Sequence, residues 1–212
     1  MNKAYIIGVG PGTKEYLLPI ALTQIKAADC LIGAKRILAE FRNLRKEEFS
    51  MEGNLGKIIP FVKAQKDKKK IAILVSGDSG LYSFLDTVSR KFKKDEYEVI
   101  PGISSMQLAF ARIGESWQDA KILSLHGRSI GNLATEVKRN PKVFLFTDPD
   151  FPPQKIAAYL IEKGIDKKRA VVGEQLGYPE ERVVDTSLKK LTKMRDFKLC
   201  VMIIKSLGVY GV

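Results

Sequence analysis

Residues 71–83 read I-A-I-L-V-S-G-D-S-G-L-Y-S, and the five apolar residues at the start of this stretch stop at Ser76-Gly77-Asp78. A run so rich in isoleucine and valine, with lysines before it and glycines after it, predicts a fully buried strand of a parallel sheet. In open α/β sheets, ligands bind beyond the carboxyl ends of the strands. This end carries a carboxylate between Gly77 and Gly80, so we expect a ligand site there.

Two other stretches repeat this design. Residues 4–12 read A-Y-I-I-G-V-G-P-G, and residues 98–105 read E-V-I-P-G-I-S-S. Both place a short apolar strand directly before a glycine turn. Because the carboxyl ends of parallel strands lie at one edge of a sheet, we expect the three strand ends to converge on one cleft.

Length and pattern predict an α/β protein with two domains. The 212 residues, of which 45% are hydrophobic, suffice for one large domain or two smaller ones. The pattern changes at residues 114–116, which places the predicted domains at 1–113 and 114–212. The first should hold a parallel sheet. The second should hold a mixed sheet, because strands at 170–174 and 182–185 lie close enough in the chain to form an antiparallel pair.

Several classes of protein are disfavoured. No run of 18 uninterrupted apolar residues is present, and the amino terminus lacks the pattern of a signal peptide, so we expect a cytoplasmic protein without a membrane span. Cys30 and Cys200 stand far apart, which argues against a disulfide framework and a zinc site. With His126 as the only histidine, a histidine-based metal cluster is also excluded, and we expect no metal.

The charge predicts an anionic partner or a basic surface. Lysine and arginine number 36 against 24 acidic residues, a formal net charge of +12. The densest basic run, at 63–70, lacks the interleaved aromatic residues of a nucleic-acid stacking platform and is more typical of a solvated helix end. A small polycarboxylate would use the same positive field, so we expect no nucleic-acid partner.

The glycine loop at 8–12 differs from the dinucleotide-binding fingerprint, which needs a third glycine two residues after the second and an acidic residue at the end of the next strand. Thr13 follows this loop, and the next predicted strand ends in L-I-G without an acid. NAD and FAD are therefore disfavoured. A rigid proline among glycines instead suits a flat surface that a bulky ligand approaches closely.

Single residues leave alternatives open. Asp78 either accepts hydrogen bonds from a ligand or caps the helix expected at 81–92, and Ser104 and Ser105 have the same two options. His126 is either structural or functional. A serine nucleophile is disfavoured because no G-x-S-x-G turn is present.

Taken in order, G-V-G-P-G, V-S-G-D-S-G-L-Y-S and V-I-P-G-I-S-S resemble the tetrapyrrole (corrin/porphyrin) methylase family. The stretches L-S-L-H-G-R and G-E-Q-L-G-Y-P-E-E-R-V are most similar to the branch that methylates C5 of precorrin-7, or of its cobalt form, in cobalamin biosynthesis. The resemblance implies the two-domain fold of that family, usually as a homodimer, with S-adenosylmethionine in the cleft between the domains and S-adenosylhomocysteine as product. No further domain for C15 methylation and decarboxylation follows residue 212, so the resemblance implies C5 methylation alone.

The resemblance also implies site residues. The cofactor-binding residues are expected to be Pro11, Gly77, Asp78, Leu81, Ser104, Ser105 and Thr147. The tetrapyrrole-binding residues are expected to be Gly10, Gly12, His126, Arg128 and Arg182. No general base is assigned.

Three other functions stay open. A diphthine synthase and a ribosomal-RNA 2′-O-methyltransferase would share the fold and the cofactor and differ in substrate. A non-catalytic RNA-binding module would instead depend on phosphate contacts, and its affinity would fall steeply with salt.

Overall fold

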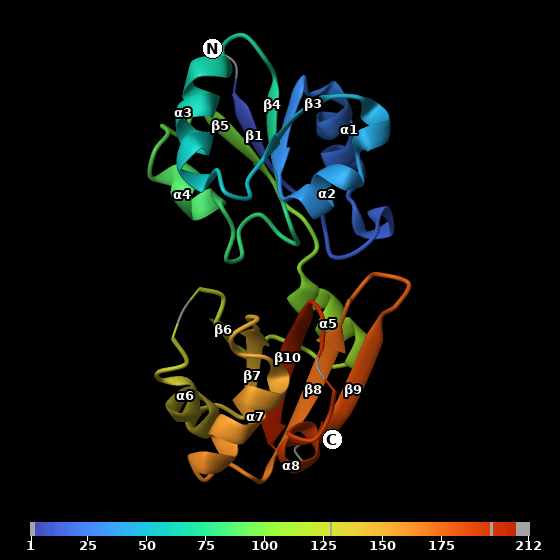
Figure 1. Cartoon of the computed structure of the whole chain (residues 1–212), viewed down its shortest axis with the longest axis vertical. Helices are drawn as coiled ribbons and strands as arrows, with labels where there is room; N and C mark the ends of the chain where they lie inside the picture. The colour runs from blue at the N-terminus through green and yellow to red at the C-terminus, as the bar shows by residue number, and fades with distance from the viewer. Residues whose placement is uncertain (1–2, 128, 196, 207–212) are drawn as a thin grey trace. The chain divides into compact units, whose positions relative to one another are not determined.

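The computed structural model describes residues 3–127, 129–195 and 197–206. The chain divides into two compact units, Met1–Ser105 and Met106–Val212, and each contains one five-stranded sheet (Figure 1). The division falls at the start of helix α5 (Ser105–Ile113), whereas the predicted boundary lies at its end. The predicted α/β class, with one parallel and one mixed sheet, is confirmed.

The first unit is a parallel sheet in the order β3-β2-β4-β1-β5. Its strands are β1 (Ala4–Gly8), β2 (Cys30–Gly33), β3 (Glu47–Ser50), β4 (Ile71–Val75) and β5 (Tyr97–Ile100). Its α-helices are α1 (Pro19–Ala27), α2 (Lys35–Ala39), α3 (Leu55–Gln65) and α4 (Leu85–Ser89), and short 3-10 helices lie at Lys14–Tyr16 and Arg42–Leu44. Strand β4 is central and every residue in it is buried, as its apolar run predicts.

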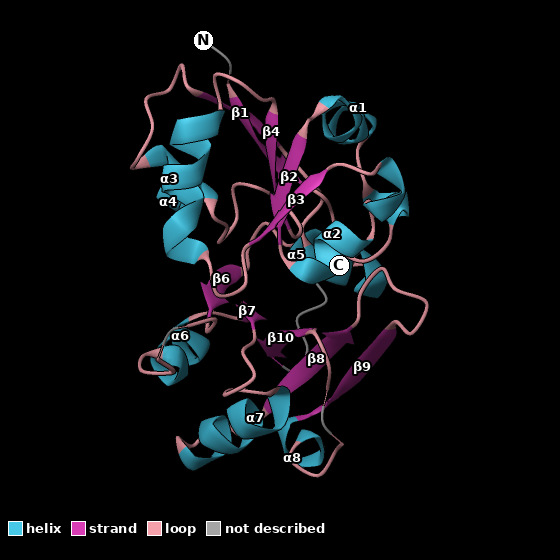
Figure 2. Cartoon of the chain, turned by 45° about the horizontal axis from the view of Figure 1, so that its top comes forward, coloured by secondary structure: helices cyan, strands magenta, loops and turns pink. Residues whose placement is uncertain are grey.

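Helices cover both faces of this sheet, which explains why β4 shows no alternation of apolar and polar residues. Ile71 and Ile73 of β4 pack with residues of α3 and α4, while Ala72 and Leu74 pack with residues of α1 and α2. The two pairs of helices lie on opposite sides of the sheet (Figure 2). Burying one such isoleucine or leucine side chain contributes about 1.5–3 kcal/mol.

Proline and turn side chains delay the start of two helices. The chain from Lys14 first makes a 3-10 turn, and α1 begins only at Pro19, because proline is favourable in the first helical turn and disrupts a helix interior. The helix predicted at 81–92 is reduced to α4. Side chains of the turn before it, Asp78 and Ser83, bond to the backbone of that turn and so keep it out of the helix. Edge strand β3 has no counterpart among the predicted strands.

The second unit is a mixed sheet in the order β6-β7-β10-β8-β9. Its strands are β6 (Lys121–Ser124), β7 (Lys142–Phe146), β8 (Lys168–Glu174), β9 (Arg182–Ser187) and β10 (Cys200–Ser206), and its helices after α5 are α6 (Leu133–Arg139), α7 (Pro153–Glu162) and α8 (Leu188–Leu191). Only β6 and β7 are parallel neighbours, and the predicted antiparallel pairing of β8 with β9 is confirmed.

The two faces of the second sheet have different partners. Val143 and Leu145 of β7 belong to a buried cluster with residues of α6, α7 and α8. Phe144 points the other way, and its ring lies 6.1 Å from that of Phe110 on α5. Strand alternation therefore places α5 on the opposite face from the other three helices.

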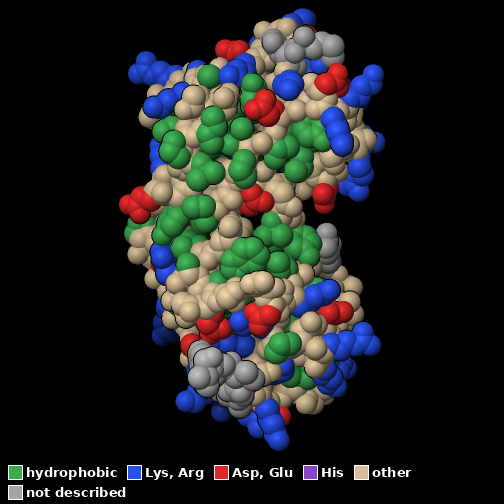
Figure 3. All heavy atoms as spheres, turned by 180° about the vertical axis from the view of Figure 1, so that it is seen from behind, with side chains coloured by type: hydrophobic (Ala, Val, Ile, Leu, Met, Phe, Trp, Pro, Cys, Tyr) green, Lys and Arg blue, Asp and Glu red, His purple; other side chains and the backbone are tan. Residues whose placement is uncertain are grey.

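The face of the protein drawn in Figure 3 has dispersed charge. On the face drawn in Figure 3, lysine and arginine side chains are scattered over both units rather than gathered in one stripe. In the part of the chain that the structure describes, no helix is both long and apolar enough to cross a membrane. Within the same residues, no three potential ligand side chains among His, Cys, Asp and Glu lie together as a metal site.

Candidate functional site

The three glycine-bearing strand ends of the first unit meet, because β4, β1 and β5 are neighbours in the sheet. A Cβ atom added to Gly102 would lie 2.3 Å from the carbonyl oxygen of Gly77, and one added to Gly8 would lie 2.7 Å from that oxygen and from the amide nitrogen of Gly102. No side chain fits between these backbones. We call segments 8–13, 76–81 and 101–105 together the strand-end surface.

Gly10 owes its lack of a side chain to packing within the chain. Its amide donates to the carbonyl of Gly77 at 3.1 Å, and the amide of Gly77 donates back at 3.0 Å. A Cβ atom on Gly10 would lie 2.6 Å from the carbonyl oxygen of Tyr16. Pro11 is buried, and Gly12 has a left-handed φ of 71° that favours glycine. The composition of this loop predicts the close approach of a ligand, whereas packing within the chain already explains why position 10 is a glycine.

Asp78 fastens the end of β4 to the end of β5. One carboxylate oxygen accepts the amide of Gly80 at 2.8 Å, and the other accepts the amide of Gly102 at 3.0 Å. The alternative that Asp78 caps the next helix is wrong, because α4 begins at Leu85 after Phe84. Ser79, which is buried, adds a second fastening by donating its hydroxyl to the carbonyl of Ile100 at 3.0 Å.

Sequence reasoning missed Ser79, although its position directly after Asp78 in a strand-end turn was a usable signal. The remaining predicted residues lie beside these two. Leu81 is half-buried in the same turn, Ser104 is buried, and Ser105 is the first residue of α5. The hydroxyl of Thr13 does not cap a helix, and it is buried without a hydrogen-bond partner among the described residues.

The strand-end surface differs in charge from the rest of the chain. In a protein of net charge +12, its three segments contain no lysine or arginine, and Asp78 is their one charged residue. A phosphate group is normally bound by basic side chains or by a helix N-terminus. A neutral or cationic ligand that contacts backbone and hydroxyl groups fits this surface better.

In the second unit, His126 and Thr147 follow the adjacent strands β6 and β7. The Thr147 hydroxyl donates to the carbonyl of Cys200 at 2.6 Å, and burial raises the pKa of the Cys200 thiol. His126 is exposed, and its Nδ1 lies 3.3 Å from a carboxylate oxygen of Asp148. Hydrogen bonds from the amides of Asp150 and Gly127 lower the pKa of Asp148. His126 therefore lies beside an ionised carboxylate.

Arg182 begins β9 and is held by a buried carboxylate. Its Nε and Nη2 donate to one oxygen of Glu174 at 2.8 and 2.7 Å, while the other oxygen accepts the amide of Lys198 at 2.7 Å. The guanidinium also lies 4.9 Å from the ring centroid of Phe197. Among the described residues, the Nη1 group of Arg182 has no bonded partner.

The structure thus places His126, Thr147 and Arg182 at one end of the second sheet. They belong to or follow three different strands, β6, β7 and β9, with β10 and β8 between the last two. Arg128, the remaining predicted tetrapyrrole-binding residue, lies outside the described residues.

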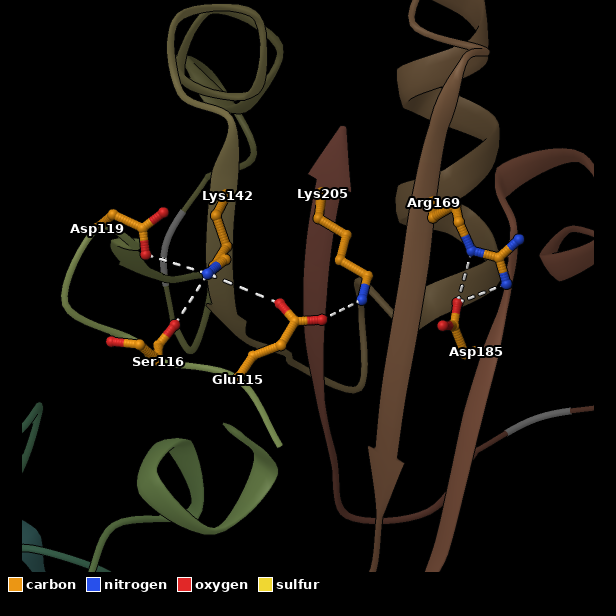
Figure 4. Close-up of polar contacts among 7 residues, drawn as sticks. All are labelled: Glu115, Ser116, Asp119, Lys142, Arg169, Asp185 and Lys205. Atoms are coloured by element: carbon orange, nitrogen blue, oxygen red, sulfur yellow. Dashed lines mark hydrogen bonds and ion pairs between the residues drawn. The ribbon is translucent and has the colours of Figure 1, made fainter. Parts of the chain in front are cut away.

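The other end of this sheet carries a separate polar cluster (Figure 4). Lys142 and Lys205 are cross-strand partners on β7 and β10, and Glu115 accepts a contact from both ammonium groups. Lys142 also contacts Asp119 at 3.0 Å, which lowers the pKa of that carboxyl. Because two like charges directly opposite each other destabilise a sheet, Glu115 has a structural task here.

The sequence pattern that defines the Tetrapyrrole (Corrin/Porphyrin) Methylases matches residues 3–192, most of this chain. The chain belongs to this family. The methylase pattern includes all three segments of the strand-end surface and the predicted residues of the second sheet, so the resemblance inferred from the motifs is confirmed.

Curated relatives of this methylase extend the match. The chain is 35% identical to the probable cobalt-precorrin-7 C(5)-methyltransferase of Methanocaldococcus jannaschii, covering 88% of this chain and 90% of the relative. It is 32% identical to the cobalt-precorrin-7 C(5)-methyltransferase of Salmonella typhimurium, covering 84% and 87%.

Solved structures confirm the methylase fold and no more. A uroporphyrin-III C-methyltransferase from Thermus thermophilus, complexed with S-adenosylhomocysteine, superposes with a TM-score of 0.72 at 19% identity, covering 96% of this chain and 92% of the other. A diphthine synthase superposes with a TM-score of 0.74 at 18% identity, covering 98% and 92%. Since both structures match this chain about equally well, the fold does not distinguish between the substrates of these two enzymes.

Proposed function

We propose that this chain transfers a methyl group from S-adenosylmethionine to C5 of cobalt-precorrin-7 or precorrin-7 in cobalamin biosynthesis. The observation that carries the proposal is the identity of 32–35% over more than four-fifths of the chain to proteins named for that reaction. The strand-end surface supports the choice of cofactor, because it is free of basic side chains and built from backbone and hydroxyl groups.

The residues present fit S-adenosylmethionine. When bound, this cofactor supplies an electrophilic methyl group on a positively charged sulfur. Segments 76–81 and 101–105 offer it amide, carbonyl and hydroxyl groups without a competing cation. Ser104, Ser105 and Leu81 are the side chains that we propose to contact it directly. Asp78 is proposed to act mainly through the backbone that it holds, because both of its oxygens already accept amide protons.

The reaction asks the protein chiefly for alignment. A reduced tetrapyrrole has an electron-rich meso carbon, and holding two reactants in line can contribute roughly 7–11 kcal/mol to lowering a barrier. A rigid surface serves this purpose, and the strand-end surface is rigid because its backbones touch and are bonded to each other.

The substrate's carboxylate side chains fit the basic chain. Arg182 is the residue proposed to bind one of them, since Glu174 fixes its guanidinium while Nη1 keeps free donors. His126 and Arg128 are proposed as further contacts of the tetrapyrrole. The proposal includes a homodimer, which light scattering on the purified protein checks.

A methyl-transfer assay tests the function. The parent protein is incubated with S-adenosylmethionine labelled at the methyl group and with a series of precorrin and cobalt-precorrin intermediates. We expect transfer to the precorrin-7 form alone, with the new methyl signal at C5. Transfer to a different intermediate, or to a translation-factor or ribosomal-RNA acceptor, would overturn the choice of substrate while keeping the cofactor. Absence of S-adenosylhomocysteine binding would overturn the enzyme assignment itself.

A further inference from the structure

The stretch E-Q-L-G-Y-P-E-E-R, between β8 and β9, forms a loop at residues 175–181 that is anchored within its own unit. The amide of Gln175 donates to the carbonyl of Leu199 at 3.0 Å, and both residues have left-handed backbone, with φ of 49° and 39°. Leu176 is buried against Gly173, where an added Cβ atom would lie 2.9 Å from the leucine side chain. Two non-glycine residues in strained backbone imply that surrounding contacts hold this loop in place.

The strongest of these contacts comes from a helix far away in the sequence. Glu181 accepts the amide of Gly177 at 2.7 Å, so its carboxylate closes the loop on itself. Two guanidinium nitrogens of Arg112, in the last turn of α5, donate to the two oxygens of the same carboxylate, and one of these distances is 3.2 Å. This pairing with Arg112 is the main reason that the pKa of Glu181 is lowered.

Arg182 is the next residue after this anchor. Its backbone directly follows Glu181 and begins the pairing of β9 with β8 opposite Glu174, and its guanidinium is held by the Glu174 carboxylate at the base of the loop. The side chain remains about half exposed, at 48%. The Glu174 carboxylate and the Phe197 ring hold this guanidinium, and Nη1 keeps its donors. A guanidinium held in this way is preorganised to bind a carboxylate.

We infer that Arg112 and Glu181 are positioning residues for substrate recognition: together they fix loop 175–181, so that Arg182 meets a carboxylate of the tetrapyrrole. This inference rests on the proposed function. Neither residue touches the reacting atoms, and their effect on the substrate passes through the backbone between 177 and 182. Loss of the anchor should therefore weaken substrate binding more than it slows methyl transfer.

The same sheet supplies a matched control. Arg169 and Asp185 form another arginine–carboxylate pair between β8 and β9, with Nε and Nη2 at 2.9 and 2.7 Å from one carboxylate oxygen. The side-chain exposure of Arg169 is 38%, and that of Arg112 is 37%. Arg169 lies at the opposite end of β8 from loop 175–181, so its removal changes the charge equally without touching the loop.

The experiment compares Arg112→Leu, Arg112→Lys and Arg169→Leu with the parent. For each protein, KM and kcat for the tetrapyrrole, the melting-temperature shift caused by S-adenosylhomocysteine, and the exchange rate of the Gly177 amide are measured. We expect Arg112→Leu to raise KM roughly tenfold, with a smaller change in kcat and faster Gly177 exchange. The KM of Arg112→Lys should lie between those of the parent and of Arg112→Leu, because lysine keeps the charge but cannot donate two parallel hydrogen bonds to one carboxylate. Arg169→Leu should match the parent.

The outcomes separate the two proposals. A parent-like KM in Arg112→Leu, or an equal rise in Arg169→Leu, overturns the positioning role even when stability falls in both variants. Unchanged Gly177 exchange in folded Arg112→Leu also overturns it, because the loop is then fixed without the anchor. If the parent itself fails to bind S-adenosylhomocysteine and to methylate the tetrapyrrole, the proposed function fails, and the substrate part of this inference fails with it.

Discussion

The strand-end surface of the first unit and the candidate end of the second sheet are built in different ways. At the strand-end surface, backbone meets backbone: a Cβ atom added to Gly8 or Gly102 would lie within 2.7 Å of the carbonyl oxygen of Gly77. At the end of the second sheet, side chains hold the structure through arginine–carboxylate pairs at Glu174 and Glu181. At Gly8 and Gly102 the first surface leaves no room for a Cβ atom, whereas the second is held by individual side chains.

This difference suits the two ligands that we propose. A cofactor shared by a whole family needs the same surface in every member, and a surface made from backbone cannot drift with side-chain changes. Substrates that differ between family members need a surface that side chains can reshape.

The first prediction would break the backbone-built surface. Gly102→Ala should destabilise the protein by about 3 kcal/mol or more, because its Cβ atom would lie 2.3 Å from a backbone oxygen that cannot move independently. Gly56→Ala is the control: Gly56 lies in α3 with nothing near its added Cβ atom, so stability should rise by up to about 1 kcal/mol. Urea unfolding measures both. A Gly102→Ala protein with parent-like stability would show that the strand ends separate easily.

The second prediction tests the side-chain-built end. Arg182→Leu should cost about 2–3 kcal/mol, because it leaves the buried carboxylate of Glu174 without its guanidinium partner. Arg169→Leu, which breaks a more exposed pair, should cost less than about 1 kcal/mol. Thermal unfolding at neutral pH compares the two. Equal losses of stability in the two variants would mean that the burial of Glu174 does not determine how much its ion pair stabilises the protein.

The third prediction concerns Asp78, the one charged side chain of the strand-end surface. Asp78→Ala should lower stability by about 1.5–3 kcal/mol, because two amides lose a charged acceptor, and Ser79→Ala should lower it by about 1 kcal/mol. Calorimetry should show S-adenosylhomocysteine affinity falling in the same order. A large loss of affinity in Asp78→Ala at unchanged stability would instead mean that the carboxylate contacts the cofactor directly.

The fourth prediction uses pH to isolate the anchor of loop 175–181. The pKa of Glu181 is lowered from its ordinary 4.5, so its pairing adds stability that is fully present above that value and is lost as pH falls through the folded-state pKa. The parent should therefore exceed Glu181→Gln by less than about 1 kcal/mol at pH 7, and the gap should close below about pH 4.5. Glu180→Gln, at the exposed neighbouring position, should show no gap. A gap for Glu181→Gln that stays constant as the pH falls from 7 into the acid range would contradict an ionic anchor.

The sequence predicted the elements whose signal is local and continuous. The apolar run of β4 and the glycine turns after β1, β4 and β5 sufficed to place three strand ends together. Strand β3 escaped prediction because it is a four-residue edge strand with two exposed glutamates, so it has no apolar run. The helix predicted from residue 81 was wrong in its start, because Asp78 and Ser83 bond to nearby backbone and compete with the helix.

Local signals in the sequence therefore predicted the family and the two kinds of sheet, since apolar periodicity and glycine turns depend on near neighbours. Only the tertiary structure decided which partner each polar side chain has. Arg112 and Glu181 lie 69 residues apart, and Asp78 and Gly102 lie 24 apart. No local pattern specifies such pairs, because they form only after packing brings separate strands and helices together, and these pairs decide whether a charged group is available to a ligand or is occupied in holding the fold.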